Sequence, residues 1–129
     1  MMGYKNQHVR NKLEGKVLDR LLQRLGPGDY YEQDTLSYIR PQTEHEYTPD
    51  FKINDSVYIE AKGIWDTDDR KKLLLVREQY PEITICMVFY NADYKIYKGS
   101  KTTYGDWCNE HGIPWIDIRT EDLPEEWFQ

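Results

Sequence analysis

The segment of residues 47–63 constrains the fold of this chain more than any other stretch. It reads Tyr-Thr-Pro-Asp-Phe-Lys-Ile-Asn-Asp-Ser-Val-Tyr-Ile-Glu-Ala-Lys-Gly, with a polar turn at residues 54–56 between two short alternating runs. Such a turn between alternating runs predicts a β-hairpin. Because successive side chains of a strand point to opposite faces, one face of the second run carries Val57, Ile59 and Ala61, and the other carries Tyr58, Glu60 and Lys62.

The hairpin brings ionisable side chains together. Asp50 follows Pro49 in the first run, so it lies close to Glu60 and Lys62 once the hairpin closes. Carboxylates held close together repel each other, and a hard divalent cation between them relieves this repulsion. A lysine beside such a metal can orient a water or stabilise negative charge that develops on a phosphate. The pattern therefore indicates a metal site for phosphate chemistry; the alternative is an ordinary strand, because Glu-x-Lys is also frequent on solvated faces.

Residues 8–25 are predicted to form the first helix, which ends at residues 26–28, Gly-Pro-Gly. The apolar residues of this helix recur at helical spacing: Leu13, Val17, Leu18, Leu21, Leu22 and Leu25. On a helical wheel Glu14 falls within roughly 20° of the centre of that apolar arc. A buried carboxylate without a partner is costly. Glu14 is therefore either a helix-edge side chain that reaches solvent or a third carboxylate of the metal site.

The remaining chain alternates between predicted strands and helices. We expect strands over residues 29–39, 83–90, 94–97 and 114–118, helices over 66–80 and 103–111, and an extended polar connector over 42–46. The acidic residues Asp66, Asp68 and Asp69 suit the N-cap and first turn of the second helix, which explains them without a metal. A length of 129 residues is enough for one domain. Trp127 and Phe128 are expected to dock the tail onto it.

The net charge of −6 hides an uneven distribution. The first 25 residues carry a net charge of +4, whereas residues 106–129 carry −6. A basic amino-terminal arm that is separate from an acidic tail permits nucleic acid to bind at one face. The sequence has no apolar stretch like a transmembrane helix or a signal peptide. We therefore expect a cytoplasmic chain without a membrane partner, in which Cys86 and Cys108 stay reduced.

The motif in which Pro49-Asp50 is followed about ten residues later by Glu60-x-Lys62 resembles the signature of the PD-(D/E)xK nuclease superfamily. Further blocks extend the resemblance to one branch, the phage endonuclease I family of Holliday-junction resolvases. These blocks are residues 13–17, 47–51, 60–65, 68–72, 77–79, 97–100, 104–105 and 111–113. They occur in order and at near-family spacing over most of the chain, which makes the resemblance specific.

The resemblance implies a restriction-endonuclease-like α/β fold, in which a mixed central β-sheet is flanked by helices. It also implies an intertwined, strand-exchanged homodimer. Residues 1–129 would form a single nuclease domain, with a basic DNA-contacting arm at residues 1–12, an inter-subunit bridge at residues 42–48 and an acidic tail at residues 119–129. Each active site would then combine Glu14 of one chain with Asp50, Glu60 and Lys62 of the other.

The resemblance also assigns roles to single residues. The catalytic residues would be Glu14, Asp50, Glu60 and Lys62. Two Mg²⁺ or Mn²⁺ ions per site, without an organic cofactor, would be held by Asp50, Glu60, the Ala61 carbonyl and Glu14. DNA would contact Lys5, Arg10, Lys12, Lys16, Lys71, Lys72 and Lys98. The expected activity is phosphodiester hydrolysis in four-way (Holliday) and other branched DNA, in the host cytoplasm if a phage encodes the chain.

Three departures from the family pattern bear on this expectation. Ala61 stands where family members usually carry threonine, but only the main-chain carbonyl is needed there. The amino-terminal arm is shorter, and residues 125–129 replace a basic extension; fewer phosphate contacts weaken DNA binding and flatten its salt dependence. Two alternatives therefore stay open. One is a related nuclease that acts on nicked, mismatched or linear duplex DNA, and the other is a catalytically silent DNA-binding module.

Overall fold

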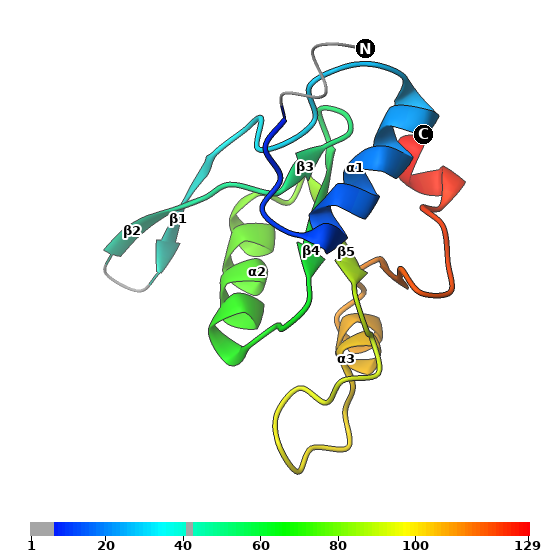
Figure 1. The fold of residues 1–129 in the computed structure, drawn as a ribbon. Coiled ribbons are helices and arrows are strands. Elements are labelled where there is room, and N and C mark those ends of the chain that lie inside the picture. Colours follow the sequence, from blue (N-terminus) through cyan, green and yellow to red (C-terminus); the bar gives the residue numbers. More distant parts are fainter. Residues whose placement is uncertain (1–6, 41–42) are drawn as a thin grey trace.

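The computed structural model describes residues 7–40 and 43–129 (Figure 1). One helix and four strands come first, and helices and strands alternate in the rest of the chain. They are α1 (Lys12–Leu25), β1 (Leu36–Arg40), β2 (Thr43–Tyr47), β3 (Phe51–Lys52), β4 (Val57–Lys62), α2 (Thr67–Gln79), β5 (Thr84–Phe89), α3 (Tyr104–Glu110), β6 (Trp115–Asp117) and the 3₁₀ helix η2 (Glu125–Phe128). No helix in the described part of the chain is both long and apolar enough to cross a membrane.

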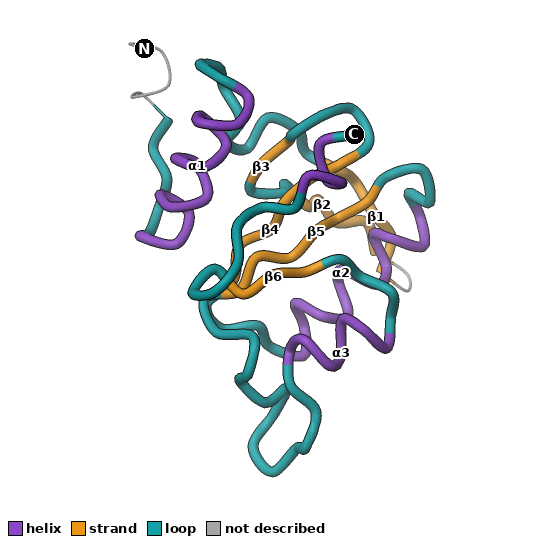
Figure 2. The backbone as a smooth tube through the Cα atoms, turned by 90° about the vertical axis from the view of Figure 1, so that its right-hand side faces the viewer, coloured by secondary structure: helices purple, strands orange, loops and turns teal. Residues whose placement is uncertain are grey.

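Strands β3, β4, β5 and β6 form the central sheet in that order. Strand β3 is antiparallel to β4, whereas β4, β5 and β6 are parallel to one another, so the sheet is mixed. The two faces of the sheet carry separate apolar cores, with α1 on one face and α2 and α3 on the other (Figure 2). The predicted α/β fold with a mixed central sheet flanked by helices is confirmed.

The predicted hairpin forms, and its two faces differ as expected. Ile53 N–H donates to the Val57 carbonyl at 3.0 Å and closes the turn between β3 and β4. Ile59 and Ala61 pack in the core that lies under α1. Glu60 and Lys62 point to the opposite face, where α2 passes. The polar face of β4 is thus covered by α2, so Glu60 is buried.

Local capping explains where the helices begin. Asn11 is the N-cap of α1, because its Oδ1 accepts a hydrogen bond from the Glu14 N–H at 2.8 Å. The helix therefore starts at Lys12 rather than at residue 8 as predicted. Asp66 and Asp69 form a reciprocal capping box at the start of α2, which confirms the predicted N-cap. Gly26 ends α1 with φ of 84°, a conformation that favours glycine.

Two strand predictions need correction. Residues 94–97 form bends rather than a strand, and Lys95 makes only an isolated bridge with Thr103. The strand predicted over 29–39 is confined to Leu36–Arg40. Glu32 interrupts it, since it adopts φ of 49° and sits beyond an isolated bridge between Tyr31 and Phe51. The alternating pattern therefore predicted strands that are too long at the places where an isolated bridge forms in place of a continuous ladder of hydrogen bonds.

The expected connector over residues 42–46 is largely a strand. Residues Thr43–Tyr47 form β2, which pairs antiparallel with β1 of the same chain, from Leu36 opposite Tyr47 to Arg40 opposite Thr43. Gln42 lies outside the described residues. The β1–β2 hairpin projects from the body of the molecule (Figure 1). Exchange of this segment between two chains stays a prediction.

The carboxyl-terminal tail docks as expected. Trp127 is buried in the core beneath α1, and Phe128 packs against the edge of that core. The Arg24 guanidinium lies over the Phe128 ring at 4.8 Å from its centroid and also contacts Glu125 at 2.7 Å. The acidic tail is thus held to α1 by both apolar packing and ion pairing.

Candidate active site

A cavity of about 600 Å³ opens at the carboxyl end of β4. It is bordered by the start of α1, the segment before β3, the end of β4, and α2. The residues with predicted roles that line it are Arg10, Glu14, Asp50, Glu60, Ala61, Lys62 and Lys72. All the residues predicted to be catalytic or to bind metal therefore lie around one hollow of a single chain, whereas the resemblance implied that Glu14 comes from a second chain.

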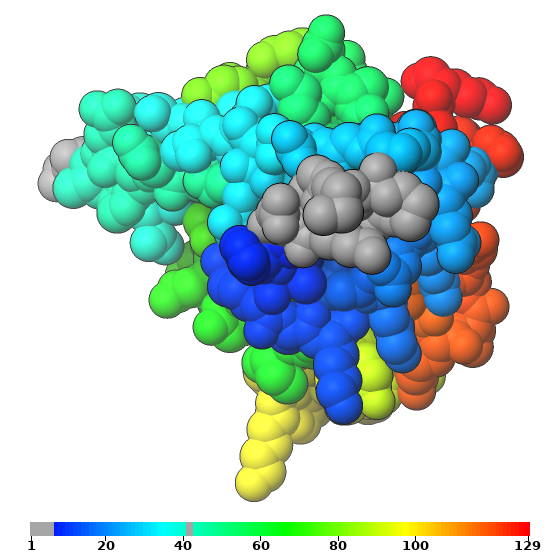
Figure 3. Space-filling model, turned by 45° about the horizontal axis from the view of Figure 1, so that its top comes forward, coloured from blue at the N-terminus to red at the C-terminus, as the bar shows by residue number. Residues whose placement is uncertain are grey.

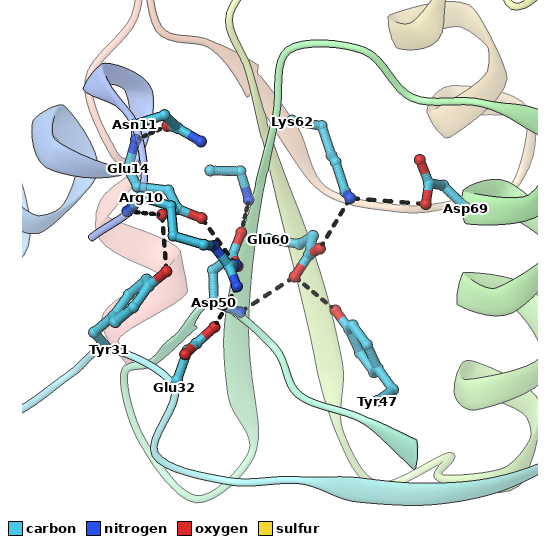
Figure 4. A network of polar contacts seen from close by, with 11 residues as sticks. Arg10, Asn11, Glu14, Tyr31, Glu32, Tyr47, Asp50, Glu60, Lys62 and Asp69 are labelled. Carbon is cyan, nitrogen blue, oxygen red and sulfur yellow. Dashed lines mark hydrogen bonds and ion pairs between the residues drawn. The ribbon is translucent and has the colours of Figure 1, made fainter. Parts of the chain in front are cut away.

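The side chains of Asp50 and Glu60 are both held by backbone N–H groups, those of Ala61 and Asp50 respectively. The Asp50 Oδ2 atom accepts a hydrogen bond from the Ala61 N–H at 2.9 Å, while the Glu60 Oε1 atom accepts from the Asp50 N–H at 3.2 Å (Figure 4). The hydroxyl of Tyr47 donates to the same Glu60 oxygen at 3.0 Å. These contacts fix two buried carboxylates side by side at the sheet edge, as the sequence predicted.

Pro49 explains why the sheet opens at this point. The β3–β4 ladder ends with Phe51 opposite Ile59. Its next hydrogen-bonding pair would set Pro49 opposite Ala61, and proline has no N–H to donate. The Ala61 N–H instead reaches the Asp50 side chain. The N–H and C=O of one strand residue point to the same side of the strand, so the Ala61 carbonyl also points toward the segment that contains Pro49. Because Pro49 has no N–H, this carbonyl receives no backbone hydrogen bond from it.

Glu14 is buried at 2% exposure, which rules out the interpretation that it reaches solvent. Its Oε1 atom accepts hydrogen bonds from the Arg10 N–H at 2.8 Å and from the Tyr31 hydroxyl at 2.9 Å. The first turn of α1 brings this carboxylate to the edge of the sheet beside Asp50 (Figure 4). Glu14 therefore belongs to the same polar cluster as the hairpin carboxylates.

The Arg10 guanidinium lies between three carboxylates. Its nitrogens are 3.3 Å from Glu14 Oε2, 3.2 Å from Asp50 Oδ1 and 3.0 Å from Glu32 Oε2. Its side chain is 63% exposed on the outer side, so it covers the cluster from solvent. In this structure Arg10 supplies positive charge to the acidic cluster, and its predicted contact with DNA stays a prediction.

Lys62 is oriented by two acidic partners. Its ammonium lies 3.7 Å from Glu60 Oε2 and 3.7 Å from Asp69 Oδ1 (Figure 4). Asp69 was predicted to serve only the start of α2. It fills that role through Oδ2, which accepts from the Asp66 N–H at 3.2 Å, and turns its other oxygen to Lys62. One carboxylate thus links a helix cap to the predicted catalytic lysine.

The electrostatics of the carboxylate pair favour an added cation. Burial raises the pKa of Asp50, and the neighbouring negative charge of Glu60 raises it further. Burial also raises the pKa of Glu60, although the positive charge of Lys62 opposes this shift. Two negative charges in such a place are therefore unfavourable unless a cation compensates them.

The donor set suits a hard divalent metal ion. Within residues 7–40 and 43–129, no three His, Cys, Asp or Glu side chains are grouped closely enough to hold a metal as they stand. However, the Arg10 guanidinium already bridges Glu14 and Asp50, so a cation is accommodated at this place. The available donors are carboxylate and carbonyl oxygens, which Mg²⁺ prefers. The residues present therefore fit the predicted metal.

A family model described as phage endonuclease I matches residues 2–129. The chain belongs to the phage endonuclease I family. Endodeoxyribonuclease 1 of Enterobacteria phage T3 is 48% identical over 108 residues, which cover 84% of this chain and 70% of that relative. Endonuclease I of Escherichia phage T7 is 43% identical over 120 residues, which cover 93% of this chain and 78% of that relative. The resemblance found in the sequence is thus confirmed.

The positively charged residues expected in this phage endonuclease I family member have different settings. Lys72 lines the cavity, and its ammonium lies 5.3 Å from the centroid of the Tyr47 ring. Four of the predicted DNA contacts are exposed at the surface outside the cavity lining: Lys12, Lys16, Lys71 and Lys98. Lys5 lies outside the described residues. Contact of these residues with DNA stays a prediction.

Four residues that contact the predicted site residues of this chain were not predicted from the sequence: Tyr31, Glu32, Tyr47 and Asp69. Asp69 was hidden because its capping role gave a sufficient explanation for an acidic side chain. Tyr47 precedes Pro49 by two residues, which was a usable signal, since it starts the same polar segment. Tyr31 and Glu32 belong to a stretch that was predicted as a regular strand, so nothing in the sequence indicated that they contact Glu14 and Arg10.

Proposed function

We propose that this chain is a metal-dependent endodeoxyribonuclease that hydrolyses phosphodiesters in branched DNA, including four-way junctions. The observation that carries the proposal is the buried pair of Asp50 and Glu60 beside Lys62 at an open cavity. The names of the relatives from phages T3 and T7 support nuclease chemistry, and the T3 name specifies DNA. An open cavity suits a long polymeric substrate better than a closed pocket does.

The metal ion would be held by Asp50, Glu60 and the Ala61 carbonyl, and Glu14 would contribute to a second metal position. When bound, Mg²⁺ or Mn²⁺ supplies a Lewis acid that polarises the phosphate and lowers the pKa of a water. The protein's own part begins with the backbone contacts that keep Asp50 and Glu60 in place. No organic cofactor is required for this reaction.

Lys62 acts on the substrate side of the carboxylates. Its ammonium orients the attacking water and stabilises the negative charge that develops on the phosphate. Asp69 and Glu60 hold this ammonium at matched distances of 3.7 Å. Lys72, at the rim of the same cavity, adds positive charge for the DNA backbone.

Branched DNA is proposed as the substrate because two symmetric sites suit two opposing strands. A homodimer places two active sites around a two-fold axis, and a four-way junction offers two equivalent strands to them. In a strand-exchanged dimer, the bridge at residues 42–48 would join the two halves. Recognition would then rest on backbone shape and charge, with Lys12 and Lys16 on α1 and the arm that contains Lys5.

Cleavage of a labelled synthetic four-way junction tests this function. The wild-type protein should cut it with Mg²⁺ and not in EDTA. Lys62→Ala and Glu60→Ala should each lower the single-turnover rate by about 10²-fold or more while junction binding persists. Glu78→Ala, on the exposed side of α2, is the matched control and should cut like the wild type. Near wild-type cutting by either site variant would show that the site assignment is wrong.

The linear arms of the junction separate the alternatives. Preference for the intact junction over its arms supports the branched-DNA proposal. Equal cutting of nicked, mismatched or linear duplexes would indicate a related nuclease with another substrate. Binding without cutting of any DNA in Mg²⁺ or Mn²⁺ would instead identify a silent DNA-binding module.

A further inference from the structure

A second hollow, of about 390 Å³, lies beside the active-site cavity. It lies between the segment that follows β4 and the loop of residues 91–103. This loop projects from the body of the molecule (Figures 1 and 3). We give the name aromatic–basic surface to five exposed residues of its lining: Ile64, Tyr94, Lys95, Tyr97 and Lys98. The volume falls within the range of roughly 300–1,000 Å³ that is usual for ligand sites.

The aromatic–basic surface exposes apolar side chains that the core does not use. Ile64 is 73% exposed, Tyr97 is 62% exposed and Tyr94 is 40% exposed. Single exposed apolar residues are ordinary, but a group of them around one hollow marks an interaction site. Tyrosine rings in particular offer flat faces on which other rings stack.

This surface rests on a fixed framework. The Tyr104 N–H donates to the Tyr94 carbonyl at 2.9 Å, and the Ile96 N–H donates to the Thr102 carbonyl at 2.9 Å. The Tyr104 hydroxyl in turn accepts a hydrogen bond from the Trp65 N–H at 3.0 Å. The loop and the segment after β4 are therefore tied together from below, which keeps the exposed rings in place.

The charge of the surface suits phosphate. Lys95 and Lys98 are both exposed, and neither forms an ion pair with any of the described residues. Asp66 also borders the hollow, but its Oδ1 atom accepts from the Asp69 N–H at 2.8 Å and is engaged in the α2 cap. Flat apolar rings beside two unengaged ammonium groups match a nucleotide, which presents a base face and a phosphate.

Ile64 connects this surface to the active site, since it lines both hollows. It follows the Lys62-Gly63 pair directly in sequence. The aromatic–basic surface therefore adjoins the cavity that holds Asp50 and Glu60. We propose that this surface is a subsite for one unpaired nucleotide next to the scissile phosphate, an inference that rests on the proposed nuclease function.

The subsite selects an unpaired nucleotide for a physical reason. Inside a duplex both faces of a base are covered by neighbouring bases, whereas a base freed at a branch point exposes a face. That face stacks on Tyr97, while Lys95 and Lys98 neutralise the adjoining phosphates. The subsite thus gives the enzyme a means to favour the branch point over a continuous duplex.

A four-way junction that carries one unpaired 2-aminopurine at the branch point, next to the cut, tests the proposal. In the Lys62→Ala background, which blocks cutting, binding should quench the 2-aminopurine fluorescence through stacking. Adding Tyr97→Ala should remove this quenching and weaken junction binding by roughly tenfold, with little change for linear duplex. Tyr97→Phe keeps the ring and should restore both signals. Leu25→Ala, an exposed apolar position at the far end of α1, is the matched control.

The outcomes separate the subsite from the nuclease function. If the wild type cuts the junction but Tyr97→Ala quenches and binds like Leu25→Ala, the subsite is wrong and the function stands. If Tyr97→Ala weakens duplex and junction binding equally, the surface is a general backbone contact and the selection of unpaired bases is wrong. A wild-type protein that neither binds nor cuts branched DNA would overturn both.

Discussion

The ammonium of Lys62 lies 3.7 Å from the carboxylate of Asp69, which also caps the first turn of α2. The second oxygen of Asp69 accepts from the Asp66 N–H, so the carboxylate cannot rotate freely. The position of Lys62 is therefore set by a helix terminus and not by the flexible end of β4 alone. Asp69 is a positioning residue, because it acts through Lys62.

Asp69→Asn should lower the single-turnover cleavage rate by about tenfold, since an amide preserves the cap but loses the charge that orients Lys62. Junction affinity should be nearly unchanged, and thermal unfolding should shift by no more than a few degrees. Asp68→Asn is the matched control, because Asp68 is an exposed neighbour on the same turn. A large loss of stability with an unchanged rate would show that Asp69 serves the cap only.

Arg10 should stabilise the metal-free protein more than the metal-loaded one. Its guanidinium compensates Glu14 and Asp50, and a divalent ion would take over that compensation. Because its side chain is largely exposed, we expect Arg10→Ala to cost only about 1 kcal/mol in EDTA, or about 4 °C, and less with Mg²⁺. Thermal unfolding in both conditions measures this, with Lys12→Ala as control. Equal losses in EDTA and Mg²⁺ would contradict the idea.

Two features of the site were accessible from sequence because each follows from a local period. The two-residue alternation of β4 placed Glu60 on one face of the strand. The helical period of α1 showed that Glu14 is a carboxylate within an apolar arc. Both periods depend only on neighbouring residues along the chain. The structure confirms both placements, since Glu60 and Glu14 are buried at the cavity edge.

The features that were missed depend on contacts between distant segments. Arg10 reaches Asp50 across 40 positions, and no local pattern distinguishes that contact from a DNA-facing arginine. The wrong strand at residues 94–97 has the same origin. Its alternating residues suit a strand, but Lys95 finds only Thr103 as a pairing partner, and the rings of Tyr94 and Tyr97 remain at the surface. Alternation predicts which residues share a side, not whether a partner strand exists.

The metal-free protein should lose stability as pH rises. Burial and then the charge of Glu60 raise the folded-state pKa of Asp50 above its unfolded value of about 4. The folded state therefore binds this proton more tightly, so the stabilising contribution is complete at low pH and is lost as pH rises through the raised pKa. Urea unfolding in EDTA at pH 5 and pH 8 measures the difference.

Asp50→Asn removes the titrating group and should flatten this dependence, whereas the exposed Asp29→Asn should leave it unchanged. Saturating Mg²⁺ should also flatten it, because the ion binds the deprotonated carboxylate and restores stability at the higher pH. A slope in Asp50→Asn equal to that of the wild type would show that other groups cause the dependence.

Pro49 should matter for metal affinity through the N–H that it lacks. The register of β3 and β4 directs the next ladder bond toward the Ala61 carbonyl, which is a proposed metal ligand. Pro49→Ala supplies a donor that competes for this carbonyl, so we expect Mg²⁺ binding to weaken by about fivefold, in keeping with the worth of one hydrogen bond of ~1 kcal/mol. Calorimetric titration measures the affinity, and Pro124→Ala is the control, since Pro124 lies by η2. If Pro49→Ala remains folded and binds Mg²⁺ as tightly as the wild type, then a ladder hydrogen bond to the Ala61 carbonyl does not compete with metal binding, and the idea is wrong.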